Sequence, residues 1–400
     1  MPDVVSAETN SSLTNSKVGW RTVRFGDVVR NVDTSVRNPL EQGIERFIGL
    51  EHLDPESLHI KRWGRVADGT SFTRKFASGQ VLFGKRRAYQ RKAAVADFEG
   101  ICSGDILVFE PKTDDLLPEL LPFIVQSDGF FDHALSTSAG SLSPRTKWSD
   151  MAKYEFVLPP KTEQGHIAEI LGEVENLEKI YVRNFMDMLS LKESSRYQFF
   201  FKSFHSSNKN FLISDIASVR YGLGQPPSGG DPDVVMIRAT NVSRGQIIEK
   251  DLLKIDSKAI PKSRRATLEE GEIIIVRSGA YVGDSAMISA KWAGSVAGYD
   301  LVVSPNKSLV FPEILAEFFV SDYVWEKLLK SKSVRSAQPH LNSTDVETIS
   351  IKIPSLDQQE KLVEMFQKFD TAIEEQKKKK ETLKKLKATL LRKLFSNQVP

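Results

Sequence analysis

The feature that most constrains the fold of this chain is an internal duplication, in which the second half repeats the pattern of the first. The aligned segment 117–135 (LPELLPFIVQSDGFFDHAL) and its counterpart share Pro118/Pro312 and Asp128/Asp322. Three segment pairs keep the same order and a nearly constant offset: residues 79–89 with 271–281, 117–135 with 311–329, and 143–160 with 338–355. The period is too long for a solenoid, so the sequence predicts two homologous modules in tandem.

Each module begins with short apolar runs and ends with a long helix-forming segment. Runs such as Val81 to Phe83 and Ile273 to Val276 are bounded by Gly, Asp, Asn and Ser, which is typical of strands and turns. The pattern predicts an α/β (mixed α+β) fold for both globular parts.

The two helix-forming segments continue without proline far beyond the ~11 to 12 residues of an average helix. Apolar residues recur along each of them at three-or-four spacing. Because long helices with an apolar stripe are not stable alone in water, each needs a partner helix, and the other copy is the simplest partner. We therefore expect two globular domains separated by a long antiparallel two-helix coiled coil, related by a pseudo-twofold internal repeat.

This pattern predicts five segments along the chain. They are a flexible N-terminal tail (1–17), a first globular domain (18–160), a first spacer helix (161–205), a second globular domain (206–355) and a second spacer helix (356–396).

The single cysteine, Cys102, excludes an internal disulfide framework, and no apolar run approaches the ~20 residues that span a bilayer. We expect a soluble cytoplasmic protein that makes no contact with a membrane.

The net charge is only +3, so any surface for nucleic acid must be local. Residues 61–92 contain ten basic residues and one acid, Asp68, with aromatic residues interleaved. Cations without balancing acids repel one another, and a phosphate backbone would relieve that repulsion. The alternative is that these charges solvate one face or form internal ion pairs.

The repeat pairs Lys85 with Arg277 and Arg145 with His340, which indicates a common backbone framework that carries different polar side chains. Such differences are expected of two domains that recognise different base sequences. The side chains that we expect to contact DNA are Arg62, Arg74, Lys75, Lys85, Arg86, Arg87, Tyr89, Arg91, Arg145 and Lys147 in the first module, and Arg238, Arg277, Ser278, Tyr281, Arg335 and His340 in the second.

Catalytic motifs are incomplete. Gly79 to Lys85 has the spacing of a nucleotide-binding loop, but Arg86 replaces the required Ser or Thr. Asp105, Glu110 and Lys112 could form a nuclease-like set, although Pro111 interrupts it and the second copy lacks matching acids. The sequence favours a binding protein without a catalytic or metal site of its own.

The chain resembles the specificity subunit of type I restriction-modification enzymes. The resemblance is carried by the tandem modules and by LPPKTEQGHIAEIL and IPSLDQQEKLVEMF, in which Pro159 and Pro354 precede a Gln-containing helix start. It implies that the globular domains are target recognition domains and that the helices dock partner subunits. The helix residues expected at this core are Gln164, Ile167, Leu171, Val174, Gln359, Leu362, Phe366, Phe369 and Ile373.

The resemblance further implies a non-catalytic subunit whose two domains each read one half of a bipartite, asymmetric site in double-stranded DNA. Two methyltransferase subunits would bring S-adenosylmethionine, and restriction subunits that translocate and cleave DNA would bring ATP and magnesium. This chain would carry no cofactor. A different hypothesis is a protein–protein scaffold that has no DNA-reading role.

Overall fold

The computed structural model describes residues 17–202, 209–261, 265–331 and 340–395. The chain divides into two compact units: unit 1 contains Met1–Val182 and Lys378–Pro400, and unit 2 contains Arg183–Lys377. Each unit therefore combines one globular head with one end of each long helix. The division falls inside the long helices, so the five segments expected from the sequence stay a prediction, and residues 1–16 of the tail lie outside the described part.

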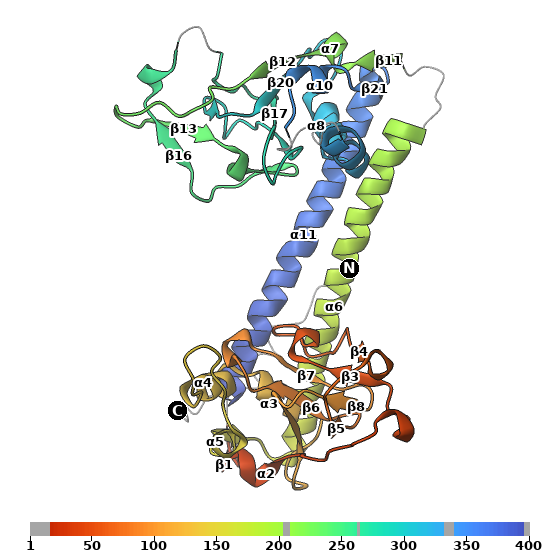
Figure 1. Ribbon diagram of the computed structural model, residues 1–400, viewed down its shortest axis with the longest axis vertical. Helices are drawn as coiled ribbons and strands as arrows, with labels where there is room; N and C mark the ends of the chain where they lie inside the picture. The colour runs from red at the N-terminus through yellow and green to blue at the C-terminus, as the bar shows by residue number, and fades with distance from the viewer. Residues whose placement is uncertain (1–16, 203–208, 262–264, 332–339, 396–400) are drawn as a thin grey trace. The chain divides into compact units, whose positions relative to one another are not determined.

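Unit 1 contains two four-stranded sheets, with strand orders β2-β9-β6-β7 and β4-β3-β8-β5, and the antiparallel pair β1-β10 (Figure 1). Its strands are β1 (Arg21–Arg24), β2 (Val29–Asn31), β3 (Arg46–Ile48), β4 (Gly64–Arg65), β5 (Arg74–Phe76), β6 (Val81–Gly84), β7 (Ala93–Val95), β8 (Gly100–Cys102), β9 (Ile106–Pro111) and β10 (Glu155–Leu158). Its shorter helices are α2 (Phe25–Val28), α3 (Leu121–Gln126), α4 (Asp128–Ser136) and α5 (Trp148–Met151).

Unit 2 contains sheets of order β12-β20-β17-β18 and β16-β13-β19, and the pairs β11-β21 and β14-β15 (Figure 1). Its strands are β11 (Lys209–Leu212), β12 (Ala217–Tyr221), β13 (Val234–Ile237), β14 (Val242–Ser243), β15 (Gln246–Ile247), β16 (Leu253–Ile255), β17 (Ile273–Ile275), β18 (Ser285–Met287), β19 (Val296–Ala297), β20 (Leu301–Pro305) and β21 (Ser350–Ile353). Its shorter helices are α7 (Ile213–Ile216), α8 (Pro312–Val320), a π-helical segment (Val324–Lys330) and α10 (Ser343–Glu347).

The two heads repeat one topology. The sheet β2-β9-β6-β7 corresponds to β12-β20-β17-β18, and the parallel pair β3-β8 corresponds to β13-β19. Strand β17 is buried on both faces, because Ile273 and Ile275 enter one apolar core while Ile274 enters a second. The same alternation in β6 places Phe83 in one core and Leu82 in another. The predicted duplication and the mixed α/β class are confirmed.

The long helices are α6 (Lys161–Tyr197), which continues as a π-helical segment (Gln198–Lys202), and α11 (Leu356–Phe395). Both begin where the sequence predicted. The predicted end of the first helix at residue 205 lies outside the described residues, as does that of the second at 396.

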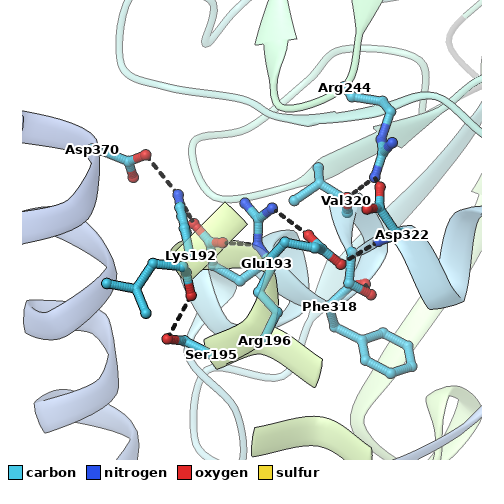
Figure 2. A network of polar contacts seen from close by, with 12 residues as sticks. Lys192, Glu193, Ser195, Arg196, Arg244, Phe318, Val320, Asp322 and Asp370 are labelled. Carbon is cyan, nitrogen blue, oxygen red and sulfur yellow. Dashed lines mark hydrogen bonds and ion pairs between the residues drawn. The ribbon is translucent and has the colours of Figure 1, made fainter. Parts of the chain in front are cut away.

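Within each unit the long helices are joined through a buried lysine. In unit 2, Lys192 Nζ lies 2.6 Å from Asp370 Oδ1 and 2.9 Å from Glu317 Oε1 (Figure 2 shows the contact with Asp370). In unit 1, Lys387 contacts Glu175. The later residue of α6, Lys192, pairs with the earlier residue of α11, Asp370, whereas the earlier Glu175 pairs with the later Lys387. The two helices are therefore antiparallel. Both lysines are over nine-tenths buried, and a buried ammonium group requires such an acidic partner.

Most of the helix residues that were expected to dock partner subunits are buried against other parts of this chain. Those that are buried are Gln164, Ile167, Leu171, Val174, Gln359 and Phe366, and those that are half-buried are Leu362, Phe369 and Ile373. In unit 1, Leu171 and Val174 share a core with Leu390 and Leu394 of α11. The buried residues therefore face the chain itself and not an outside protein.

A fully buried glutamine attaches each long helix to its head. Gln164 Oε1 accepts a hydrogen bond from the Leu117 N–H at 2.8 Å, while Gln164 Nε2 donates to the carbonyl oxygens of Asp115 and Pro159 at 2.7 and 2.9 Å. Gln359 makes the equivalent three bonds, with Phe311 N–H at 2.8 Å, Leu309 O at 3.0 Å and Pro354 O at 3.1 Å. The glutamine satisfies three backbone groups that would otherwise be buried without partners.

We predict that Gln359→Leu destabilises unit 2, because it leaves the Phe311 N–H and two carbonyl groups unpaired. At 1–3 kcal/mol for each buried unpaired group, the free energy of unfolding should fall by about 3 kcal/mol or more. Urea or thermal unfolding of the whole chain measures this change. The control is Gln358→Leu at the exposed neighbouring position, which should change stability by less than about 0.5 kcal/mol; equal effects would contradict the assignment.

Candidate nucleic-acid interface

In unit 1 two loops that are far apart in the sequence meet at one end of the sheet β2-β9-β6-β7. Strand β6 ends just before Lys85, and the following loop pairs with the segment that contains Arg145. A backbone bridge joins Arg86 to Arg145, the Arg87 N–H donates to Pro144 O at 2.8 Å, and the Thr146 N–H donates to Lys85 O at 3.1 Å. The structure therefore brings together two groups of residues that the sequence suggested separately.

One carboxylate lies among these cations. Arg145 donates to Asp105 through Nε at 2.7 Å and Nη2 at 3.1 Å, and Arg86 Nη1 lies 3.5 Å from the same carboxylate. The hydrogen bond from Arg145 is the main cause that holds the pKa of Asp105 below its usual value. Burial, reinforced by the nearby Arg74 cation, lowers the pKa of Lys85. The loop pair is a cationic cluster around a single acid.

Unit 2 has the same arrangement with different side chains. Arg277 follows β17, a backbone bridge joins Ser278 to His340, and the Leu341 N–H donates to Arg277 O at 2.7 Å. The bridge Ser278–His340 occupies the position of Arg86–Arg145 in the aligned repeat. Tyr281, on the same loop, is 52% exposed.

The Arg277 guanidinium lies between two tyrosine rings. Its central carbon is 4.9 Å from the ring centre of Tyr221 and 4.5 Å from that of Tyr299. The two rings are 40% and 54% exposed. Neither tyrosine was among the residues predicted from the sequence to contact DNA. Their positions could have indicated them, because Tyr221 ends one strand-like run and Tyr299 lies just before another.

Asp300 is the counterpart of Asp105, but it is placed differently. It is 1% exposed, its Oδ1 accepts the Arg277 backbone N–H at 3.2 Å, and its Oδ2 has no hydrogen-bond partner. Burial raises the pKa of Asp300 to about 6. In the first head this acid forms ion pairs with two arginines, whereas in the second it is buried and accepts only a backbone N–H among the described residues.

The argument that the cations of residues 61–92 lack balancing acids is wrong, because the acids come from other parts of the fold. The observed ion pairs include Arg62–Asp54 at 2.5 Å, Arg74–Asp33 at 2.8 Å, Lys75–Glu99 at 3.6 Å and Arg91–Asp128 at 2.8 Å. Much of this charge is therefore neutralised within the head. Tyr89 and Lys147 remain exposed and are better placed to contact a ligand.

Arg91 has a structural role that recurs in unit 2. Its Nη2 donates to Gln126 O at 3.2 Å and to Asp128 at 2.8 Å, at the start of α4, and its guanidinium lies 4.6 Å from the Phe131 ring centre. In unit 2 the equivalent bonds run from Arg244 to Val320 O and Asp322 (Figure 2). The Arg244 guanidinium lies 4.7 Å from the ring centre of Trp325, which takes the place of Phe131. We therefore leave Arg91 out of the proposed DNA surface.

The other candidates are distributed as follows. Arg87 Nη2 donates to Ser143 Oγ at 3.3 Å, and Arg238 Nη2 donates to Asp251 O at 2.5 Å. Arg335 lies outside the described residues. The nuclease-like set is not assembled, because Asp105 precedes β9 while Glu110 is near its end, bound to Arg30 and Gln80.

The described part of the chain gives little support for metal binding, for a reactive cysteine or for a membrane span. No group of three or more His, Cys, Asp or Glu residues there could hold a metal ion. Burial raises the pKa of Cys102 to about 12, which keeps its thiol protonated. None of the described helices is long and apolar enough to cross a bilayer.

Comparison with known proteins gives a consistent result. The family model described as Type I restriction modification DNA specificity domain matches residues 17–183 and 227–385. The chain is 28% identical over 177 residues to the type I restriction enzyme EcoDI specificity subunit of Escherichia coli, a match that covers 42% of this chain and 37% of that relative. It is 25% identical over 427 aligned residues to the MjaVIII specificity subunit of Methanocaldococcus jannaschii, covering 95% and 93% of the two chains.

A solved structure, described as the structural basis underlying complex assembly and conformational transition of the type I R-M system, contains a chain of similar fold. The TM-score is 0.64 at 17% sequence identity, with 95% of this chain and 99% of that chain covered.

We predict that Asp300→Asn stabilises unit 2 at pH 8 and has little effect near pH 4. The raised pKa means that the folded state holds a proton that the unfolded state has lost, so stability falls as pH rises from about 4 to about 6. A shift of about two units corresponds to ~3 kcal/mol at most. Thermal unfolding from pH 4 to pH 8 measures this effect, and lower stability of the variant at pH 8 would contradict it.

Proposed function

Because the chain belongs to the family of type I restriction modification DNA specificity domains and carries two copies of that domain, we propose that each head reads one half of a bipartite, asymmetric DNA target. The reading surface is the loop pair at the end of the four-stranded sheet. In this role the chain recognises DNA and leaves methylation and cleavage to other subunits.

The observation that carries this proposal is the equivalence of the two loop pairs. Both heads use the same backbone bridge, yet Arg86 and Arg145 in the first stand where Ser278 and His340 stand in the second. A framework that is kept while its outward side chains change is suited to reading two different half-sites, because arginine, serine and histidine bind different base edges.

The surfaces of the two heads also suggest different ways of holding DNA. The first head offers Lys85, Arg86, Arg87 and Lys147, and cations of this kind gain affinity by replacing counterions on phosphates. The second offers one arginine between exposed tyrosine rings, which suits contact with the bases themselves.

We further propose that the long helices dock two methyltransferase subunits, through which the restriction subunits join. Large apolar side chains remain exposed on α6: Leu177, Ile180 and Val182 in unit 1, and Met186, Leu189 and Leu191 in unit 2. Exposed apolar positions of this kind mark protein-binding surfaces. S-adenosylmethionine, ATP and magnesium would then be bound by those partners.

The double substitution Arg86→Ser with Arg145→His should change the bases read by the first head only, because it installs the polar tips of the second head. Sequencing of methylated sites in cells that carry the assembled complex identifies both half-sites and the gap between them. The control is Arg24→Ser, an exposed arginine on β1 that pairs with Glu155. A change in both half-sites would refute independent readers.

Binding of duplex DNA by the assembled complex should weaken steeply as salt is added, which separates a DNA reader from a scaffold. If Lys147 contacts a phosphate, Lys147→Ala should reduce the slope of log affinity against log salt by about 0.9. Lys153→Ala is the control, since Lys153 is exposed and paired with Asp150 at 3.1 Å. Absence of DNA affinity in the wild-type complex would favour the scaffold.

A further inference from the structure

We propose that Arg277 determines base specificity in the second head, where its guanidinium binds the O6 and N7 atoms of a guanine in the major groove. This inference rests on the proposed DNA-reading role of the head. It adds a particular side chain, the residues that hold it, and the chemical group that it recognises.

Three neighbouring strands place the residues of this site together. Tyr221 is the last residue of β12, Asp300 directly precedes β20, and Arg277 lies two residues after the end of β17. Because β20 lies between β12 and β17 in the sheet, all three residues lie at the same end. Tyr299 comes with Asp300, and the Tyr221 hydroxyl accepts a hydrogen bond from the Ser343 N–H at 3.1 Å, which fixes its ring.

The Arg277 guanidinium is held by rings and not by acceptors. Among the residues that the structure describes, no hydrogen bond or ion pair engages it, and its Nε is buried without a partner. Arg220, on β12 of the same sheet, is the opposite case, since both of its terminal nitrogens bind Glu272 at 2.7 Å. Arg277 is therefore held in place with its donors unused.

An arginine that is held by aromatic rings and whose N–H donors are unused is suited to direct recognition of a base. Its planar group carries two parallel N–H donors, which match the paired acceptors of guanine. Immobilising a long side chain normally costs affinity on binding, and the clamp between Tyr221 and Tyr299 has already restricted Arg277 before DNA arrives.

The surroundings favour a neutral base over a phosphate. The buried carboxyl group of Asp300 accepts the Arg277 backbone N–H, and its charge, when ionised, offsets that of Arg277, which weakens attraction to a phosphate more than to a neutral base. The bridged neighbour Ser278 adds no charge. Tyr221 and Tyr299 are 40% and 54% exposed, so their rings offer apolar surface on which a planar base can stack.

The test compares Arg277→Lys with wild type in the assembled complex, using a library of duplexes that varies each position of both half-sites. Lysine keeps the charge but lacks the planar pair of donors. We expect the preference for guanine at one position of one half-site to disappear and the affinity for the best site to fall roughly 10- to 100-fold. The other half-site, the gap and the salt slope should stay unchanged.

Two control variants complete the experiment. Arg265→Lys changes an exposed arginine of unit 2 that pairs with Glu269 at 2.8 Å, and it should leave base preference unchanged. Tyr299→Ala removes one side of the clamp and should weaken the same guanine preference, in a protein whose thermal unfolding matches wild type.

Retention of the guanine preference by Arg277→Lys would overturn the inference. So would Arg277→Ala if it lowered affinity equally for all sequences and reduced the salt slope, which would identify a phosphate contact. In both cases sequence-specific binding by the wild-type complex would still support the proposed function. A wild-type complex with no base preference in either half-site would refute that function itself.

Discussion

Each unit depends on covering the apolar stripe of the long helices. Helices of this length are not stable alone in water when one face is apolar, so tertiary contacts must bury that face. In unit 1 the core of the head contains Ile167 and Leu171 of α6 together with Leu390 and Leu394 of α11. Head and helices therefore share one core in unit 1, which explains why the compact units divide within the helices and not at their ends.

Within these apolar contacts, the buried lysines and glutamines named above have polar partners. Lys192 and Lys387 enter the helix pairs only with acidic residues beside them, because the cost of dehydrating an ammonium group would otherwise exceed what its methylene groups gain. Gln164 and Gln359 act in the same way for backbone groups. The ion pairs thus specify which residues of the two helices face one another, and the glutamines specify how each helix joins its head.

The two heads show how one backbone frame supports different chemistry. An aspartate stands at the same strand end in both, as Asp105 and Asp300. With Arg145 beside it the first carboxylate is ionised and fixed in an ion pair, whereas the second is buried and has a raised pKa. The first head has Arg145 where the second has His340 in the aligned repeat, so the arginine that pairs with the acid in the first head has no counterpart in the second.

The sequence by itself determined the duplication, the mixed α/β class and the starts of both long helices, because periodicity and aligned segments are local properties of the chain. It also identified Arg86 and Arg145 as candidates, but only the tertiary structure joined them. Ion pairs such as Arg74–Asp33 and the clamp of Arg277 by Tyr221 and Tyr299 could not be predicted, since they connect distant segments. Whether a cation is neutralised or left free depends on which strands become neighbours, and no count of charges along a window contains that information.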